Sequence, residues 1–542
     1  MHVFAVVPIF TSAGAALLPT ILAAIAGMAA ILFKPRELWR LSCRRPVEVG
    51  VSAAAIAIGL AVLAWVSAFG ATSRTAVHAD QRATITIDWA KVAEDIIAKE
   101  RTGTMPTSLS SADANDRIGT ATTSLSPPNE VQADQPLVLG GDYARCFYGG
   151  GSSPVQLKQR WSFRPEDTMF LSSPVVAGKR VFAAGCQSDL GGYVGLLAAI
   201  DLETGKPLWK VTQLGEDVLR PFFSSPALTR DGKYLLIGQG LHADGDCSLL
   251  CFDAATGQFR WAVNTALHIE SSPAIFGDLA VVGAGAIEGK DGKAVGDPGY
   301  VMGVRISDGK ELWRQPVNDP ESSPAIDENG MIYIGSGFNG NAVVAIRSDS
   351  KERLREKRLD RTVWRTEIEM PVTSAITLLG ELAVAGAGNG DFVHSNQDAR
   401  GIVVALDRKT GDIRWRTPFN DAVLGVIAGR DNMLICPSRT GEVTALAVKD
   451  GRVLWRSRIS GNAPVLAGCA FTGQRIYAVS SDGYLAVLNP QDGKMLAKTY
   501  LNDQAQPGSG LSLSSPMVVG GLVVVGSETG GLHCFERSES AP

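Results

Sequence analysis

The sequence predicts an all-β protein, an eight-bladed β-propeller of four-stranded antiparallel blades preceded by two transmembrane helices. Two observations carry this prediction. A turn followed by a strand that ends in Trp recurs between about residues 155 and 536, at intervals of 40 to 52 residues. Two long uncharged stretches lie near the N-terminus. Four short strands per unit at such a period are typical of propeller blades.

Two short motifs define the repeated unit. The first is a turn of the D-x-x-T-G type that leads into the Trp-ended strand, as in DLETGKPLW (201–209) and DRKTGDIRW (407–415). Gly accepts a positive φ in a tight turn, and Asp bonds its own backbone there. The second is Ser-Ser-Pro, which starts at 172, 224, 271, 322 and 514, with degenerate forms at 373, 424 and 462. Together the motifs count eight units.

The two ends of the repeat region complement each other. The last unit, from 514 onward, supplies only three strands, whereas a lone strand, KQRWSF (158–163), precedes the first unit. We expect this strand to complete the eighth blade, because closure removes the free sheet edges.

The N-terminal stretches predict a membrane anchor. Residues 3–33 and 49–73 contain no charged side chain, and each exceeds the ~20 residues that a helix needs to span a bilayer. The segment between them is strongly basic and is expected to stay cytoplasmic. A cleaved signal peptide is the rival interpretation, but the positive leading segment is missing. The predicted domains are an anchor (1–73), a polar stalk with a short helix (74–139) and the propeller (140–542), on the periplasmic side of the inner membrane.

Charge and composition exclude one class of partner. The chain has 51 Lys and Arg against 55 Asp and Glu, a net charge of −4, so it lacks the basic surface of a nucleic-acid-binding protein.

The repeat resembles the pyrroloquinoline quinone (PQQ) repeat of eight-bladed quinoprotein dehydrogenases, and it is similar to the propeller of the outer-membrane assembly lipoprotein BamB. The resemblance implies that the repeat tryptophans dock neighbouring blades: Trp161, Trp209, Trp261, Trp313, Trp364, Trp415 and Trp455. Quinoprotein alcohol dehydrogenases also share a vicinal disulfide, a calcium ion and a Trp stacked on the quinone. This sequence has no Cys-Cys pair, and none of its ten Trp is left for stacking.

One face of the ring is the predicted site. With strands A to D counted from the inside, the B→C and D→A loops share a face, and the B→C loops are long in blades 2, 3 and 5. Variable loops on a rigid scaffold carry function. The candidates are the acidic and His residues of these loops: His242, Asp244, Asp246, His268, Glu270, Asp297, Asp319, Glu321, Asp391 and His394. Clustered carboxylates could hold Ca²⁺ or meet a basic or polar partner, or they could form only a solvated acidic rim.

The spacing of the cysteines predicts no disulfide pairing. Seven lie in the predicted exported part, where disulfides are allowed, yet buried free thiols are the expected state.

No catalytic spacing is found, so the favoured function is a membrane-tethered protein-binding scaffold that acts through its loop-rich acidic face. The alternative is an oxidoreductase that needs PQQ and Ca²⁺; the residues by themselves predict no cofactor. An extracellular sensor ranks last, because the expected cytoplasmic loop is too short for an output module.

Overall fold

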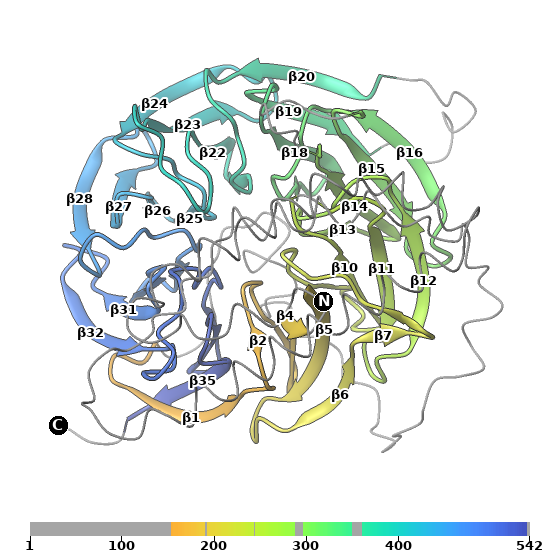
Figure 1. Cartoon of the computed structure of the whole chain (residues 1–542). Coiled ribbons are helices and arrows are strands. Elements are labelled where there is room, and N and C mark those ends of the chain that lie inside the picture. Colours follow the sequence, from red (N-terminus) through yellow and green to blue (C-terminus); the bar gives the residue numbers. More distant parts are fainter. Residues whose placement is uncertain (1–152, 190–191, 243, 288–295, 349–359, 539–542) are drawn as a thin grey trace, which may run out of the picture. The chain divides into compact units, whose positions relative to one another are not determined.

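A computed structural model describes residues 153–189, 192–242, 244–287, 296–348 and 360–538. Eight antiparallel sheets of four principal strands form a ring (Figure 1), which confirms the predicted propeller. The first sheet carries a further short strand, β2 (Thr168–Met169), paired with the strand next to the innermost one. The predicted anchor and stalk lie outside the described residues. Among the residues that are described, no helix has the length and apolar character needed to cross a membrane.

The strands fall into four concentric positions. The innermost strands are β3 (Val175–Ala177), β9 (Ala227–Leu228), β13 (Ala274–Phe276), β17 (Ala325–Ile326), β21 (Thr377–Leu379), β25 (Ala428–Arg430), β29 (Ala470–Phe471) and β33 (Met517–Val519). Next come β4 (Arg180–Asp189), β10 (Tyr234–Gly238), β14 (Leu279–Ala284), β18 (Met331–Ser336), β22 (Leu382–Gly388), β26 (Met433–Pro437), β30 (Ile476–Val479) and β34 (Leu522–Gly526). The third are β5 (Gly192–Asp201), β11 (Ser248–Asp253), β15 (Tyr300–Arg305), β19 (Ala342–Arg347), β23 (Gly401–Asp407), β27 (Glu442–Ala447), β31 (Tyr484–Leu488) and β35 (Leu532–Arg537). The outermost are β6 (Pro207–Val211), β12 (Phe259–Asn264), β16 (Glu311–Pro316), β20 (Thr362–Glu367), β24 (Ile413–Phe419), β28 (Val453–Arg458), β32 (Met495–Tyr500) and β1 (Leu157–Phe163).

The ring closes as the sequence predicts. Strand β1 pairs antiparallel with β35, from Leu157 opposite Arg537 to Phe163 opposite Leu532, and the two lie side by side in orange and blue in Figure 1. The hydroxyl of Tyr477 also donates a 2.7 Å hydrogen bond to the carbonyl of Pro154, just before β1. The start of the ring is therefore bonded to blades 7 and 8.

The repeat tryptophans join neighbouring blades through the glycine-containing turns that precede the outermost strands. Trp261 Nε1 donates to the carbonyl of Ile306 at 2.8 Å, and Gly309 of that turn lies under the indole with φ +68°. A Cβ at this glycine would lie 2.6 Å from Trp261 Cγ, so the turn needs Gly for its conformation and for the close approach. The same donation to the next blade runs from Trp161 to Leu202, Trp209 to Ala254, Trp364 to Arg408, Trp415 to Val448 and Trp455 to Pro490.

Trp313 departs from this pattern. Among the described residues its Nε1 has no acceptor, and the guanidinium of Arg361 lies 4.9 Å from the ring centroid instead.

A bulge in the outermost strand directs each Trp. The pairing of β11 with β12 shifts by one residue between Trp261 and Phe259, and the outer strands of the other blades shift at the equivalent place. Bulges bend and twist a strand and re-aim its side chains. They turn the indole toward the next blade.

The Ser-Ser-Pro motif links the inner strands of neighbouring blades by hydrogen bonds along part of the central channel; we call this series the serine belt. The second serine's N–H donates to the second serine's hydroxyl in the next blade at 2.9 Å, from Ser173 to Ser225, from Ser225 to Ser272 and from Ser272 to Ser323. Ser515 donates to Ser173 in the same way across the junction of the last and first blades. In blade 7 the equivalent donor is Gly468, so the triplet there is 467–469. The sequence-based placement at 462–464 is wrong, because strand β29 begins only at residue 470.

Two glycines of blade 3 test the tryptophan contact. Gly309 and Gly277 have nearly the same φ, +68° and +59°, but a Cβ at Gly277 would meet no atom within 4 Å. Gly277→Ala should lower the free energy of unfolding by about 1–2 kcal/mol, the penalty of a left-handed residue. Gly309→Ala should lose about 1–3 kcal/mol more, because the indole of Trp261 must shift. Denaturant midpoints of the two variants measure the difference, and equal losses would contradict the tryptophan contact.

Candidate functional site

The D→A and B→C loops meet on one face, as the sequence analysis expects, and this loop-rich face has a lopsided outline. Between blades 1 and 2 the connection adds a small hairpin, β7 (Gln213–Leu214) with β8 (Asp217–Val218). The long B→C loop of blade 5 covers residues 389–400. Each projects a large apolar side chain into solvent: Val218 is 59% exposed and Val393 46% exposed. Both stand beside an aspartate, Asp217 and Asp391 respectively.

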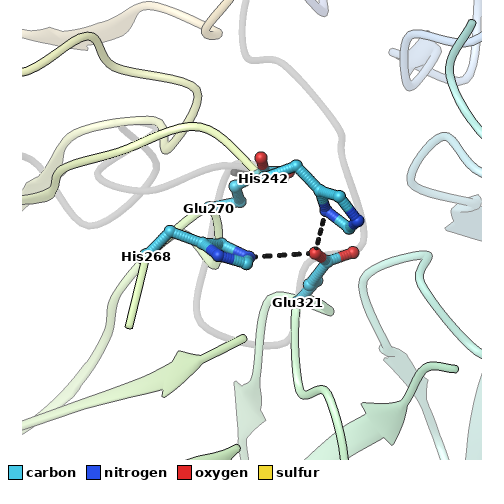
Figure 2. Close-up of side chains that lie close together, drawn as sticks. All are labelled: His242, His268, Glu270 and Glu321. Carbon is cyan, nitrogen blue, oxygen red and sulfur yellow. Dashed lines mark hydrogen bonds and ion pairs between the residues drawn. The ribbon is translucent and has the colours of Figure 1, made fainter. Parts of the chain in front are cut away.

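Four predicted residues converge at the mouth of the central channel (Figure 2); we call His242, His268, Glu270 and Glu321 the mouth cluster. Glu321 lies at its centre. His242 Nδ1 is 2.5 Å and His268 Nε2 is 3.0 Å from the same carboxylate atom, Glu321 Oε1. One ligand-type atom from each of the four residues lies within 4.8 Å of all the others. The loops of three blades therefore meet in one small polar cluster.

The backbone around the mouth cluster holds its members in place. His242 follows the end of β10 in the B→C loop of blade 2, while His268 and Glu270 lie in the connection to blade 3. The N–H of Ile269 donates to the carbonyl of Gln239 at 2.8 Å, and that of Gly285 donates to the carbonyl of His268 at 3.1 Å. A Cβ at Gly285 would lie 2.4 Å from His268 Nε2, so glycine there leaves room for the imidazole.

Burial and mutual repulsion shape the electrostatics of these carboxyl groups. Burial, together with the negative charge of Glu321, raises the pKa of Glu270 to about 8 and that of Asp319 to about 7. Burial also disfavours charge on Glu321, but the ion pairs and hydrogen bonds from His242 and His268 outweigh it and hold the Glu321 pKa well below its usual value. The cluster therefore concentrates negative charge on Glu321 and leaves Glu270 beside it in need of a proton or a cation.

Two predicted candidates serve the backbone instead of facing a ligand. Asp244 is buried and accepts the N–H of Leu241 at 2.8 Å, which closes its own loop. Asp319, also buried, accepts the N–H groups of Ala286 and Phe338, each at 3.0 Å. These two aspartates fix the loops on either side of the mouth cluster.

The remaining candidates are exposed and do not join the cluster. Asp246 and Asp297 are exposed on the blade 2 and blade 3 loops. Asp391 accepts the N–H groups of Val393 and His394, and His394 is 70% exposed, 3.9 Å from Asp391. The structure thus brings together four of the ten predicted residues, buries Asp244 and Asp319 against loop backbone, and leaves the other four exposed on the rim.

The mouth of the channel is covered by residues that sequence reasoning missed. Phe392 of the blade 5 loop meets Phe223 of blade 2 edge-on, with ring centroids 5.2 Å apart. Arg439 of blade 6 holds that loop by donating to the carbonyls of Asp391 and Val393 at 2.7 and 2.8 Å. Phe223 and Phe392 line a cavity of about 80 Å³ together with Glu270 and Glu321. Sites for small organic ligands usually measure about 300–1,000 Å³.

The cysteines of the described residues are all free. Six thiols are buried, Cys186, Cys247, Cys251, Cys436, Cys469 and Cys534, which agrees with the expected state. Burial raises the pKa of Cys186 to about 12, so this thiol stays protonated at neutral pH and is unsuited to act as a nucleophile or ligand.

Comparison with known proteins gives the family of this ring. The family model described as "Outer membrane protein assembly factor BamB" matches residues 158–359 and 355–542. The chain belongs to this family. Among curated members, the Yersinia pestis BamB is 24% identical over 382 residues, which span 67% of this chain and 84% of that protein.

Solved structures share the propeller of this BamB-family chain. BamB from Moraxella catarrhalis superimposes with a TM-score of 0.51 at 15% identity, covering 70% of this chain and 99% of that one. A quinohemoprotein alcohol dehydrogenase from Comamonas testosteroni gives 0.55 at 14% identity, covering 76% and 82%. A dehydrogenase of the same kind from Pseudomonas putida is 27% identical over 271 residues, 48% of this chain and 34% of that protein. At such identities the structural likeness shows the fold alone.

The contact of Arg439 with the blade 5 loop can be tested by hydrogen exchange. Arg439→Met removes two hydrogen bonds from a charged donor, each worth about 1.5–3 kcal/mol, so exchange at residues 391–394 should accelerate at least roughly tenfold. Arg400→Met is the matched control, because Arg400 of the same loop pairs only with the exposed Asp398 at 3.3 Å. Equal protection in both variants would show that Arg439 does not hold the loop.

Proposed function

We propose that this chain is a protein-binding scaffold that engages its partner through the loop-rich face and performs no catalysis of its own. The observation that carries the proposal is the pairing of exposed apolar tips with acidic neighbours on that face, at Val218 and Val393. Contact with a partner would remove these apolar side chains from water, and their acidic neighbours could pair with basic groups of that partner.

The small size of the channel cavity supports the same function. The cavity that Phe223 and Phe392 line measures about 80 Å³, room for a few water molecules and well below the usual volume of an organic cofactor site. A partner that docks on the face would contact the loop tips and would not need to enter the ring.

The relatives support a role in the cell envelope. Curated members carry the name outer membrane protein assembly factor, and this chain spans 84% of the length of the Yersinia pestis and Burkholderia pseudomallei proteins. We propose a partner of that kind, a protein concerned with the assembly of membrane proteins. Fold alone does not determine function, so the test must measure contacts made by the loop-rich face itself.

The proposal includes a membrane tether with the ring on the periplasmic side. The uncharged stretches 3–33 and 49–73 support it, together with the basic segment between them. The stalk, 74–139, would keep the ring at a high local concentration near membrane-bound partners.

The similarity to quinohemoprotein alcohol dehydrogenases favours one second candidate, a PQQ- and Ca²⁺-dependent oxidoreductase. This candidate predicts that the purified full chain retains PQQ through gel filtration in the presence of Ca²⁺ and then reduces a dye with alcohols or sugars. Retained cofactor and dye reduction together would replace the scaffold proposal.

Site-specific photo-crosslinking tests the scaffold proposal directly. A photoreactive amino acid at position 218 or 393 of the full chain, expressed in its own cells, should give a discrete adduct with one envelope protein. The matched controls are positions 363 and 454, where Val363 and Leu454 are 40% and 37% exposed on the outer strands β20 and β28. Adducts that form equally well at the outer strands, or none at the loop tips, would contradict the proposed face.

A further inference from the structure

The mouth cluster has the composition and spacing of a metal site. It offers two imidazole nitrogens and two carboxylates, with the four donor atoms within 4.8 Å of one another. A zinc ion with bonds of about 2.0–2.1 Å in tetrahedral geometry holds its ligand atoms about 3.3 Å apart. Two nitrogens lie 2.5 and 3.0 Å from Glu321 Oε1, close to that spacing, and the Glu270 donor lies within 4.8 Å of the other three.

The two imidazoles of the mouth cluster converge on the same carboxylate oxygen. Both imidazoles point at Glu321 Oε1 (Figure 2), and the partly buried Glu270 stands beside them and accepts a hydrogen bond from the backbone N–H of His242. Two carboxylates thus lie close together at a partly buried site. A divalent cation at the centre would neutralise their charge and take a lone pair from each imidazole.

An ion bound at the mouth cluster would join loops from three blades. His242 comes from the blade 2 loop, His268 and Glu270 from the connection between blades 2 and 3, and Glu321 from the connection between blades 3 and 4. Four protein ligands fill a tetrahedral shell, which is typical of structural sites, whereas catalytic zinc keeps an open position for water.

We propose that the mouth cluster binds one divalent transition-metal ion of the zinc class, which ties together the loops of three blades. Imidazole ligands select such ions, whereas Ca²⁺ prefers six to eight oxygen atoms, so the calcium alternative of the sequence analysis fits these four residues poorly. The site is independent of the proposed scaffold function: it concerns the purified chain without any partner.

Metal titration of the purified full chain tests the proposal. After chelator treatment and its removal, Zn²⁺ added in competition with a chromophoric chelator should bind at one equivalent per chain and raise the melting temperature. Co²⁺ in its place should give the visible absorption of a tetrahedral N/O site. A large excess of Ca²⁺ should leave both signals unchanged.

Substitutions of single residues in the mouth cluster test which side chains bind the ion. His242→Gln removes a ligand that is 39% exposed, so the fold should persist while the Zn²⁺ affinity falls at least roughly 100-fold. Glu321→Gln should do the same and abolish the cobalt spectrum. His394→Gln is the matched control, since His394 lies on the same face and is 70% exposed but contributes no donor to the cluster. Less than one bound equivalent, displacement of Zn²⁺ by Ca²⁺, or an affinity unchanged in His242→Gln and Glu321→Gln would overturn the proposal.

Discussion

The pairing of β1 with β35 is the constraint on which the rest of this molecule depends. A propeller sheet left with three strands would expose an edge and leave the first and last blades free to separate. Strand β1 removes that edge through six paired positions, and the serine belt also bridges the last and first blades, because the N–H of Ser515 donates to the hydroxyl of Ser173. Because closure fixes the rotation of every blade, it also decides which loops share a face and which side chains meet at the channel mouth.

The periodic part of the fold could be predicted because its determinants are local and repeated. Each D-x-x-T-G turn carries its own conformational signal, and the indole that packs on it recurs at the same offset, as at Gly309 with Trp261. These repeats give the number of blades and the closing strand. They also predict that the B→C and D→A loops share a face. The weaker units show the limit of the method. In blade 7 the inner triplet had lost both serines, and only the pairing of β29 and the bond from Gly468 to Ser515 fix its place.

The site was predictable only as far as topology alone determines it. Residues just before an inner strand must ring the channel, which is why His268, Glu270 and Glu321 were identified and do meet. Residues inside long loops obey no such rule, because their place depends on tertiary contacts. Phe392 packs against Phe223, and two hydrogen bonds from Arg439 hold the loop that carries it. These contacts do not recur from blade to blade, so no repeated sequence pattern predicts them. Composition likewise could not show that Asp244 and Asp319 are already used by backbone N–H groups.

These contacts divide the loop-rich face into two parts with different physics. In the mouth cluster His268 is buried and the other three side chains are partly buried, and both imidazoles contact Glu321, so the donors are gathered where a small ion could bind. At the rim, Val218 and Val393 lie on loop tips in water, where contact with a partner would remove apolar surface from solvent. Ordering the inner ring would hold the bases of the blade 2 and blade 3 loops while their tips stay free to fit a partner. A rigid base under adaptable tips lowers the entropy lost on binding, which is the advantage that a preorganised scaffold has over a flexible chain.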